Sequence, residues 1–322
     1  MQLPPPRGPL SAWVIDHLRG TGTPSAHPAP GQVLDDDFQL ALWCCYELHY
    51  RGFDDVAADA EWDPVLLAFR AELERPFTEW LSTLVKPEPS ATEPVAVQLR
   101  RLIDADDGPS LAAYLHRHAT REQFREFLLN RSVYQLKEAD PHSYGIPRLD
   151  GAVKAALVEI QADEYGGGRA ERMHAELFRT TMRWLDLDDT YGRYVPDVPG
   201  VTLALSNAMS LFALHSRWTG ALLGHLAALE MTSTLPNRRY ASGAARLGAT
   251  EEQARYFTEH VEADAVHEQI AAHDLCGQYA EENPDAVPDI LFGAACCLAL
   301  DNLVAEHLLT AWNAGQEGQV AS

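Results

Sequence analysis

Apolar side chains recur at helical spacing through almost the whole chain after residue 95. No stretch alternates apolar and polar residues in the way that a half-buried strand requires. The three glycines at 166–168 follow no strand and precede no GK[ST] sequence, so they do not form a phosphate-binding loop. This pattern predicts an all-α main domain. Helices are expected near 96–105, 109–118, 121–139, 148–164, 169–186, 203–233, 238–247, 250–281 and 284–315.

The residues before 95 form a second, smaller region. Apolar spacing predicts helices near 8–20, from Asp35 to about residue 53, and near 63–86. The segment KPEPSATEP, residues 86–94, is rich in Pro and Glu and marks the best candidate boundary, either a linker or a long surface loop. We expect an N-terminal helical extension at 1–90 and a main domain at 95–318.

The charge and hydropathy of the chain narrow its partners. Its 322 residues carry a formal net charge of −22, which repels nucleic acid and anionic lipid, so we expect neither as a partner. We expect no apolar run of the roughly 20 residues that a membrane-spanning helix needs. The N-terminal sequence MQLPPPRGPLSAW lacks a signal-peptide core. These features favour a cytoplasmic protein without a membrane partner.

One segment concentrates side chains that bind metals. His260, Asp264 and His267 stand at positions i, i+4 and i+7, with no Gly or Pro near them. At about 100° per residue, the three side chains fall within roughly 60° of one another on one helix face. Two imidazoles and a carboxylate that face the same way make half of a non-haem iron site. The rest of the chain must supply the other half.

A second segment repeats part of this pattern. Glu171 and His174 are spaced i, i+3, which places both on one helix face. Asp264 and His267 form the same unit with Asp in place of Glu. Di-iron carboxylate proteins use Glu-x-x-His units of this kind to bind their two metals. Two such units in one all-α chain are far rarer than one, so together they predict a di-metal site.

A di-metal helical site also needs carboxylates from the remaining helices. Glu230 lies in the otherwise apolar GHLAALEMTS, and Glu138 closes a helix before Pro141. Glu164 precedes Glu171 by seven residues, which is about two helical turns. The glycines between these two residues indicate a kink or a π-bulge beside the site.

Each of these side chains also has a simpler interpretation. Glu138 could be a surface acid, Glu164 a helix cap, and Glu230 half of a buried salt bridge. A lone His260 is typical of a partly buried, hydrogen-bonded histidine, and Asp163 reads as a solvated neighbour. Carboxylates and imidazoles together suit Fe(II) and leave positions open for O₂. The predicted metal ligands are Glu138, Glu164, Glu171, His174, Glu230, His260, Asp264 and His267.

The sequences DEYGGGRAERMH and HVEADAVHE resemble those of the haem-oxygenase-like di-iron oxidases and oxygenases, also called iron-containing redox enzymes. The similarity covers about residues 95–315. It implies a haem-oxygenase-like helical bundle that binds two irons in place of haem, whereas spacing alone would also allow a ferritin-like bundle. Within this family, the order Glu, Glu-x6-Glu-x-x-His, His-x3-Asp-x-x-His is similar to that of the nitrogen-oxidising branch found in the streptozotocin pathway. Glu164 is the carboxylate that marks this branch.

The resemblance also implies cofactors, partners and a reaction. Two Fe²⁺ ions would activate O₂ with electrons from an external donor, and oxygen would pass to an amine or guanidine nitrogen of a small amino-acid-like substrate. The N-terminal helices would form a homodimer, as in relatives. The alternatives are an O₂-dependent desaturase or C–C lyase acting on a fatty or amino acid, an iron-binding helical module without turnover, and a helical interaction protein without metal. An arginine could bind a substrate carboxylate, but the sequence does not single out one among Arg131, Arg148, Arg217, Arg238 and Arg239.

Overall fold

The computed structural model describes residues 1–21, 29 and 31–320, and of 262–265 and 315–320 it describes the backbone alone. The fold is all-α as predicted: 73% of the residues are helical, and the described part of the chain forms no strand. The α-helices are α1 (Pro9–Leu18), α2 (Asp36–Glu47), α3 (Pro64–Leu84), α4 (Val95–Asp104), α5 (Leu111–Arg117), α6 (Arg121–Gln135), α7 (Asp140–Ser143), α8 (Gly151–Glu164), α9 (His174–Trp184), α10 (Gly200–Leu214), α11 (Thr219–Arg246), α12 (Arg255–Gln269), α13 (Gln278–Glu282) and α14 (Val287–Val320). Shorter 3₁₀ turns are η1 (Ala58–Trp62), η2 (Ile146–Arg148), η3 (Gly166–Gly168), η4 (Ala170–Arg172), η5 (Ser216–Trp218) and η7 (Pro284–Ala286), and η6 (Ile270–Gly277) is a π-helix.

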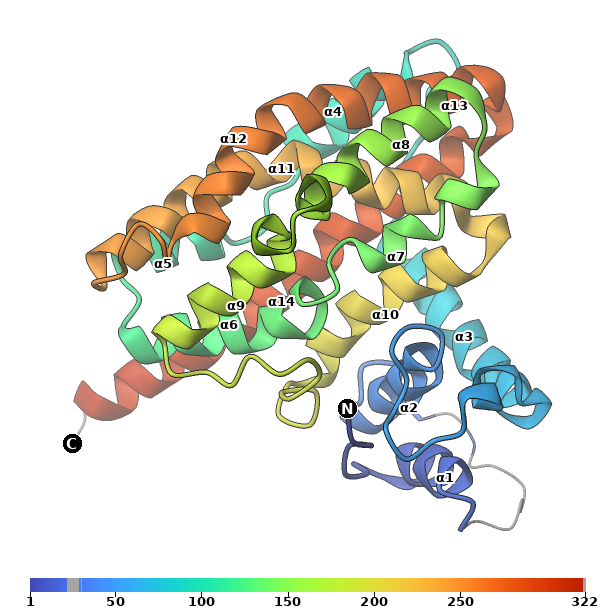
Figure 1. Ribbon diagram of the computed structural model, residues 1–322. Coiled ribbons are helices and arrows are strands. Elements are labelled where there is room, and N and C mark those ends of the chain that lie inside the picture. Colours follow the sequence, from blue (N-terminus) through green and yellow to red (C-terminus); the bar gives the residue numbers. More distant parts are fainter. Residues whose placement is uncertain (22–28, 30, 321–322) are drawn as a thin grey trace.

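The two longest helices, α11 and α14, pack against each other through the middle of the bundle (Figure 1). Two glycines permit their close approach. A Cβ atom at Gly224 would overlap the carbonyl oxygen of Ile290, and one at Gly293 would overlap that of Ala221. Any larger side chain at either position would therefore push the two helices apart.

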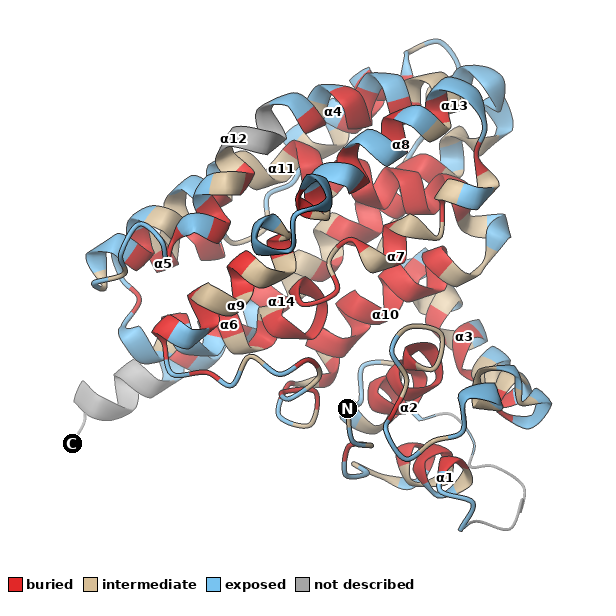
Figure 2. Ribbon diagram, in the orientation of Figure 1, coloured by how far each residue is buried: buried red, intermediate tan, exposed pale blue. Residues whose placement is uncertain are grey.

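Buried apolar side chains form two clusters, and Figure 2 shows that the buried residues lie mainly on the inner helices and inner helix faces. The larger cluster joins α1–α3 to α5, α6, α9, α10 and α12, and the smaller one joins α4, α8 and η6. Helices α11 and α14 contribute to both. The predicted ligands lie on or beside helices from both clusters, so the site forms only where the two halves of the bundle meet.

The N-terminal helices lie at one end of the bundle, beside α10 (Figure 1). Phe38 and Trp43 of α2 and Leu73 of α3 belong to the same apolar cluster as Phe212 of α10. The chain between α3 and α4, residues 85–94, is not helical, and it coincides with the predicted boundary. Whether 1–90 behaves as a separate unit stays a prediction.

A buried ion pair ties α2 to the segment that follows α6. The Nζ atom of Lys137 lies 3.1 Å from Oε2 of Glu47, and neither side chain is more than 1% exposed. The hydroxyl of Tyr191 donates to the same Glu47 oxygen at 2.7 Å. Arg51 also donates to the carbonyl of Leu136 at 3.2 Å. The residues around 136–138 are therefore held from the N-terminal side of the molecule.

Two helix boundaries differ from the prediction. The helix expected over 203–233 is broken where His215 is extended (φ −106°, ψ 117°), and α11 begins only at Thr219. Helix α11 then continues through Pro236, where a break between 233 and 238 was expected. A proline removes one helical hydrogen bond, but buried Asn237 and Tyr240 continue the packed face of α11 beyond it. Tertiary packing thus outweighs the local preference.

The helix expected over 250–281 also has a different form. It consists of α12, an eight-residue π-helix (η6) and the short α13. A π-helix is wider than an α-helix and occurs mostly in short pieces, often at functional sites. This one begins three residues after His267, within a segment that the sequence predicted as one continuous helix.

One described helix contradicts the expectation about apolar runs. Residues Pro284–Ala314 are long and apolar enough to cross a bilayer, with a mean hydropathy of 1.6 over their most apolar 18 residues. Half of that window is buried inside the bundle, where α14 packs against α10 and α11. The core helix of a bundle has the same composition, because neighbouring helices cover most of its surface.

Candidate metal centre

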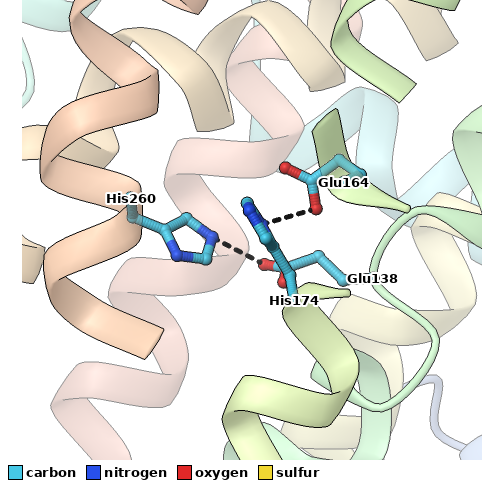
Figure 3. A group of neighbouring side chains, drawn as sticks. All are labelled: Glu138, Glu164, His174 and His260. Carbon is cyan, nitrogen blue, oxygen red and sulfur yellow. Dashed lines mark ion pairs between the residues drawn. The ribbon is translucent and has the colours of Figure 1, made fainter. Parts of the chain in front are cut away.

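Four predicted ligands meet in the interior of the bundle (Figure 3). Glu138, Glu164, His174 and His260 each offer one nitrogen or oxygen atom, and these atoms all lie within 4.8 Å of one another. Nδ1 of His174 is 2.9 Å from Oε2 of Glu164, and Nε2 of His260 is 3.8 Å from Oε1 of Glu138. Glu138 is partly exposed and the other three are buried. This group could hold a metal ion.

A second group adjoins the first. Glu164, Glu230 and His267 are all buried, and their ligand atoms also lie within 4.8 Å of one another. Nδ1 of His267 is 3.4 Å from Oε2 of Glu230. Because Glu164 belongs to both groups, its carboxylate stands between the two positions. Carboxylates in di-metal helical proteins bridge their metals from such a place.

A glycine turn brings Glu164 and His174 together. Glu164 is the last residue of α8 and His174 the first of α9. Between them Gly166, Gly167 and Gly168 all have positive φ (68°, 60° and 80°), a conformation that other residues rarely adopt. A Cβ atom at Gly166 would also lie only 2.6 Å from the backbone nitrogen of Met173. The glycine run is therefore a kink beside the site, one of the two forms predicted for it.

Glu171 does not join either group in the described residues. It lies in the 3₁₀ turn η4 and is exposed. Met173 is extended (φ −57°, ψ 133°), so it separates Glu171 from the helix that His174 begins. The expectation that these two residues share one helix face is wrong, because the glycine turn ends the helix on which the i, i+3 rule depends.

Helix α12 supplies both groups. His260 belongs to the first and His267 to the second. Seven residues span roughly 10 Å along an α-helix, so one helix face can reach both positions. Asp264 lies between them on α12, but its side chain is outside the described residues. Its role as a ligand stays a prediction.

Tyr256 supports two members of the first group. Its hydroxyl lies 3.0 Å from each carboxylate oxygen of Glu138. Its backbone carbonyl lies 2.8 Å from Nδ1 of His260, so Nδ1 carries the proton and Nε2 faces the cluster. Histidines that bind metals commonly donate their other ring N–H in this way. The sequence reasoning missed Tyr256, although its place four residues before His260 was a usable signal.

Asp163 supports the second group. Its Oδ2 atom lies 3.0 Å from Nε2 of His267, while the rest of the carboxylate is largely exposed. A carboxylate that accepts from one ring nitrogen fixes the histidine tautomer and leaves the other nitrogen for a metal. The interpretation of Asp163 as a solvated neighbour is thus incomplete, since this residue orients His267 toward Glu230.

The charges in the cluster depend on one another. Burial acts to raise the pKa of Glu164, but the facing imidazoles of His174, His260 and His267 outweigh it and hold the pKa at about 2. Burial acts to lower the pKa of His267, yet Glu230 and Asp163 raise it to about 9. Burial raises the pKa of Glu230 itself. The carboxylates therefore require positive charge beside them.

The donor set fits iron. Only carboxylate oxygens and imidazole nitrogens make up the two groups, and this combination suits Fe(II). Oε2 of Glu164 and Nδ1 of His174 are buried and form an ion pair at 2.9 Å, and outside this pair neither atom has a hydrogen-bond partner among the described residues. A metal cation bound by both atoms would replace the proton that the histidine holds in this pair.

A cavity of about 270 Å³ opens from the first group between α6, α11 and α14. Glu138, Glu164, Glu230 and His260 form part of its wall at the metal end. A small molecule in this cavity would reach the candidate ligands directly, so the cavity is the natural place for a substrate.

Comparison with known proteins places this geometry in a family. Residues 125–302, more than half of the chain, match the family described as iron-containing redox enzyme. The chain belongs to this family. The matched stretch contains all six clustered residues, and membership confirms the resemblance at the level of an iron-containing oxidoreductase.

Comparisons with curated proteins and solved structures do not narrow the assignment beyond the family. No curated protein matches the chain. Among solved structures, a domain of unknown function with a heme oxygenase-like fold from Shewanella denitrificans OS217 is similar. It is 14% identical, with a TM-score of 0.49 over 70% of this chain and 92% of that one.

Proposed function

We propose that the protein is a non-haem di-iron oxygenase that oxygenates an amine or guanidine nitrogen of a small amino-acid-like substrate. The observation that carries the proposal is the position of Glu164, a buried carboxylate common to two adjoining groups of ligand-type side chains. Membership of the iron-containing redox enzyme family supports iron as the metal.

Each side chain has a role in this proposal. Glu138, His174 and His260 would hold one ion, Glu230 and His267 the other, and Glu164 both. Bound iron would supply the reduction of O₂ and the transfer of one oxygen atom. Tyr256 and Asp163 hold Glu138 and His267 in place through the hydrogen bonds described above.

The reaction balances with an external reductant. The amine and O₂, with two electrons and two protons, give a hydroxylamine and one molecule of water. An N–H bond is replaced by N–O and O–H bonds in the product, and the second oxygen atom leaves as water. The two electrons come from a donor outside the chain.

The cavity supports a polar substrate. Arg131, Gln135, Gln161 and Asn237 all line it. A fatty chain would leave Oε1 of Gln135 and both amide atoms of Gln161 without hydrogen-bond partners, which is unfavourable in a buried site. A small amine or guanidine with further polar groups would satisfy them.

Anaerobic loading with Fe²⁺ followed by exposure to O₂ tests the proposal. We expect two irons per chain, O₂ consumption that accelerates with an amine or guanidine substrate, and a product that gains one oxygen atom on nitrogen. Mass spectrometry distinguishes this product from one that has lost hydrogen, carbon dioxide or formaldehyde. Fewer than two irons, or iron oxidation that no amine alters, would contradict the proposal.

A further inference from the structure

Polar side chains from α6 and from the turn that follows it line the cavity beside the candidate metal centre. Arg131 and Gln135 lie one helical turn apart on α6, which ends at Gln135, and Glu138 lies in the turn that follows. The cavity therefore has candidate metal ligands at one end and, further back along α6, a guanidinium group.

Arg131 is held in place at the outer end. Its side chain is only 13% exposed, and Nη2 donates to Oδ1 of Asp301 at 2.7 Å. Nη1 donates to the hydroxyl of Tyr134. Arginine offers five N–H donors, more than Asp301 and the nearby tyrosines occupy. Of the five arginines that the sequence left as candidates, Arg131 alone lines this cavity.

Two glutamines between the ends lack partners within the described residues. Oε1 of Gln135 makes no hydrogen bond, and neither do Oε1 and Nε2 of Gln161. Gln135 is 8% exposed and Gln161 is 2% exposed, and both line the cavity. Buried amide atoms are normally paired, so unpaired ones that face a cavity indicate a ligand with complementary groups.

We propose that Arg131 binds the carboxylate of the substrate and that Asp301 binds an ammonium group beside it. Gln135 and Gln161 then accept N–H groups from the part of the substrate that extends toward the metal centre. The predicted substrate class is an α-amino acid with a terminal amine or guanidine.

This assignment rests on the proposed function for the reacting end only. The recognition of the carboxylate depends on Arg131 and not on iron. The Arg131–Asp301 pair is therefore the receptor for the charged end of the molecule, and the metal centre acts on the other end.

Calorimetric titration of the full chain tests the assignment, with protein that is metal-free or loaded with Fe²⁺ without O₂. The probes are three amino acids and their decarboxylated counterparts: ornithine and putrescine, lysine and cadaverine, arginine and agmatine. We expect at least one amino acid to bind about tenfold or more tightly than its counterpart, the gain of a charge-assisted contact. The substitution R131Q should remove that preference. The matched control is R193Q, because Arg193 pairs with Asp188 and Asp197 outside the cavity.

Two results would overturn the assignment: no amino acid binds better than its counterpart, or R131Q keeps the preference. If R131Q does not fold, the double variant R131Q/D301N decides, since it leaves no unpaired acid. Two irons per chain without a carboxylate preference would reject this inference and leave the metal function intact. An Arg131-dependent preference in a protein that binds no iron would support this inference and contradict the proposed metal function.

Discussion

Two clusters of buried charge lie next to each other in this protein and differ in how their atoms are paired. In the first, Lys137 and Glu47 contact each other directly, and Tyr191 donates to the same carboxylate. In the second, Glu164 and His174 form an ion pair at 2.9 Å, and outside this pair neither atom has a hydrogen-bond partner among the described residues. Lys137 and Glu138 are consecutive residues, yet one belongs to each cluster.

The difference shows how burial alone can mislead. When the atoms of a buried ion pair are all paired within the protein, none of them is free to bind a ligand. Carboxylates and imidazoles that pair only with one another can exchange the imidazole proton for a metal cation. We therefore regard Glu47–Lys137 as structural and the glutamate–histidine cluster as a binding site.

The largest expected effect comes from breaking the Glu47–Lys137 ion pair, called closed here because its atoms are paired within the protein. The substitution K137M leaves the Glu47 carboxylate buried without its counterion, so we expect the free energy of unfolding to fall by about 3–5 kcal/mol. Urea unfolding followed by circular dichroism measures the loss. The control is K86M, because Lys86 is exposed and its replacement should cost little. A loss below about 1 kcal/mol for K137M would show that this pair is not closed.

A third buried pair, His142 and His225, extends the comparison because both side chains are held neutral. His142 and His225 face each other with ring nitrogens 3.2 Å apart, and burial lowers the pKa of both, to about 4 for His142. Between pH 6.5 and 4 the unfolded chain binds a proton at His142 that the folded chain does not, so stability falls as pH falls. The contribution of His142 is about 3 kcal/mol across this window.

Unfolding titrations between pH 7 and pH 4 test this expectation. The variant H142Q should show a shallower loss of stability with acid than the wild type. Equal slopes for the two proteins would mean that His142 is not held neutral.

Metal binding should stabilise the protein through the glutamate–histidine cluster and not through the Glu47–Lys137 pair. At a free metal concentration about 100 times the dissociation constant, binding stabilises the folded state by about 2.7 kcal/mol. We expect E164Q to lose both ions and this stabilisation, because Glu164 belongs to both groups. H260Q should lose mainly one ion. Iron content and thermal unfolding report both quantities.

The matched control for these variants is E171Q. Glu171 is exposed and outside both groups, so the iron content of the E171Q variant should equal that of the wild type. A loss of iron in E171Q would show that Glu171 is a metal ligand and that its exposed position in η4 is not the one it takes in the metal-bound protein.

The smallest effect is expected for E230Q in the metal-free protein. Burial raises the pKa of Glu230. Its carboxylate helps to raise the pKa of His267, but Asp163 pairs with the same imidazole, so a neutral amide of the same shape leaves His267 with one carboxylate partner. We expect a change of about 1 kcal/mol or less in the free energy of unfolding. A loss as large as that of K137M would show that Glu230 is part of a closed ion pair, as one reading of the sequence allowed.

The sequence predicted the fold class because helical periodicity is a local signal. It also named Glu138, Glu164, His174, Glu230, His260 and His267, which the structure brings together. The i, i+3 and i+4 rules found the residues on continuous helices. They failed at Glu171, because the extended backbone of Met173 separates the turn η4 from α9.

Other features were hidden for physical reasons. Gln135 and Gln161 look like ordinary surface residues in the sequence, because only the packing of α6, α8 and α11 buries them. The break at His215 and the continuous helix through Pro236 depend on tertiary contacts that no local pattern contains. Arg131 could not be separated from the other arginines until its place beside the cavity was known.

The salt bridge between Glu47 and Lys137 has a consequence for how the molecule can be divided. Lys137 immediately precedes a candidate ligand, and its counterion comes from a helix some 90 positions earlier in the chain. A fragment that starts at residue 95 would lack Glu47 and the rings of Trp43 and Tyr50 that cover the Lys137 ammonium group at the edge of the metal centre. We therefore expect the chemistry of this protein to depend on its first helices, even though the family match begins only at residue 125.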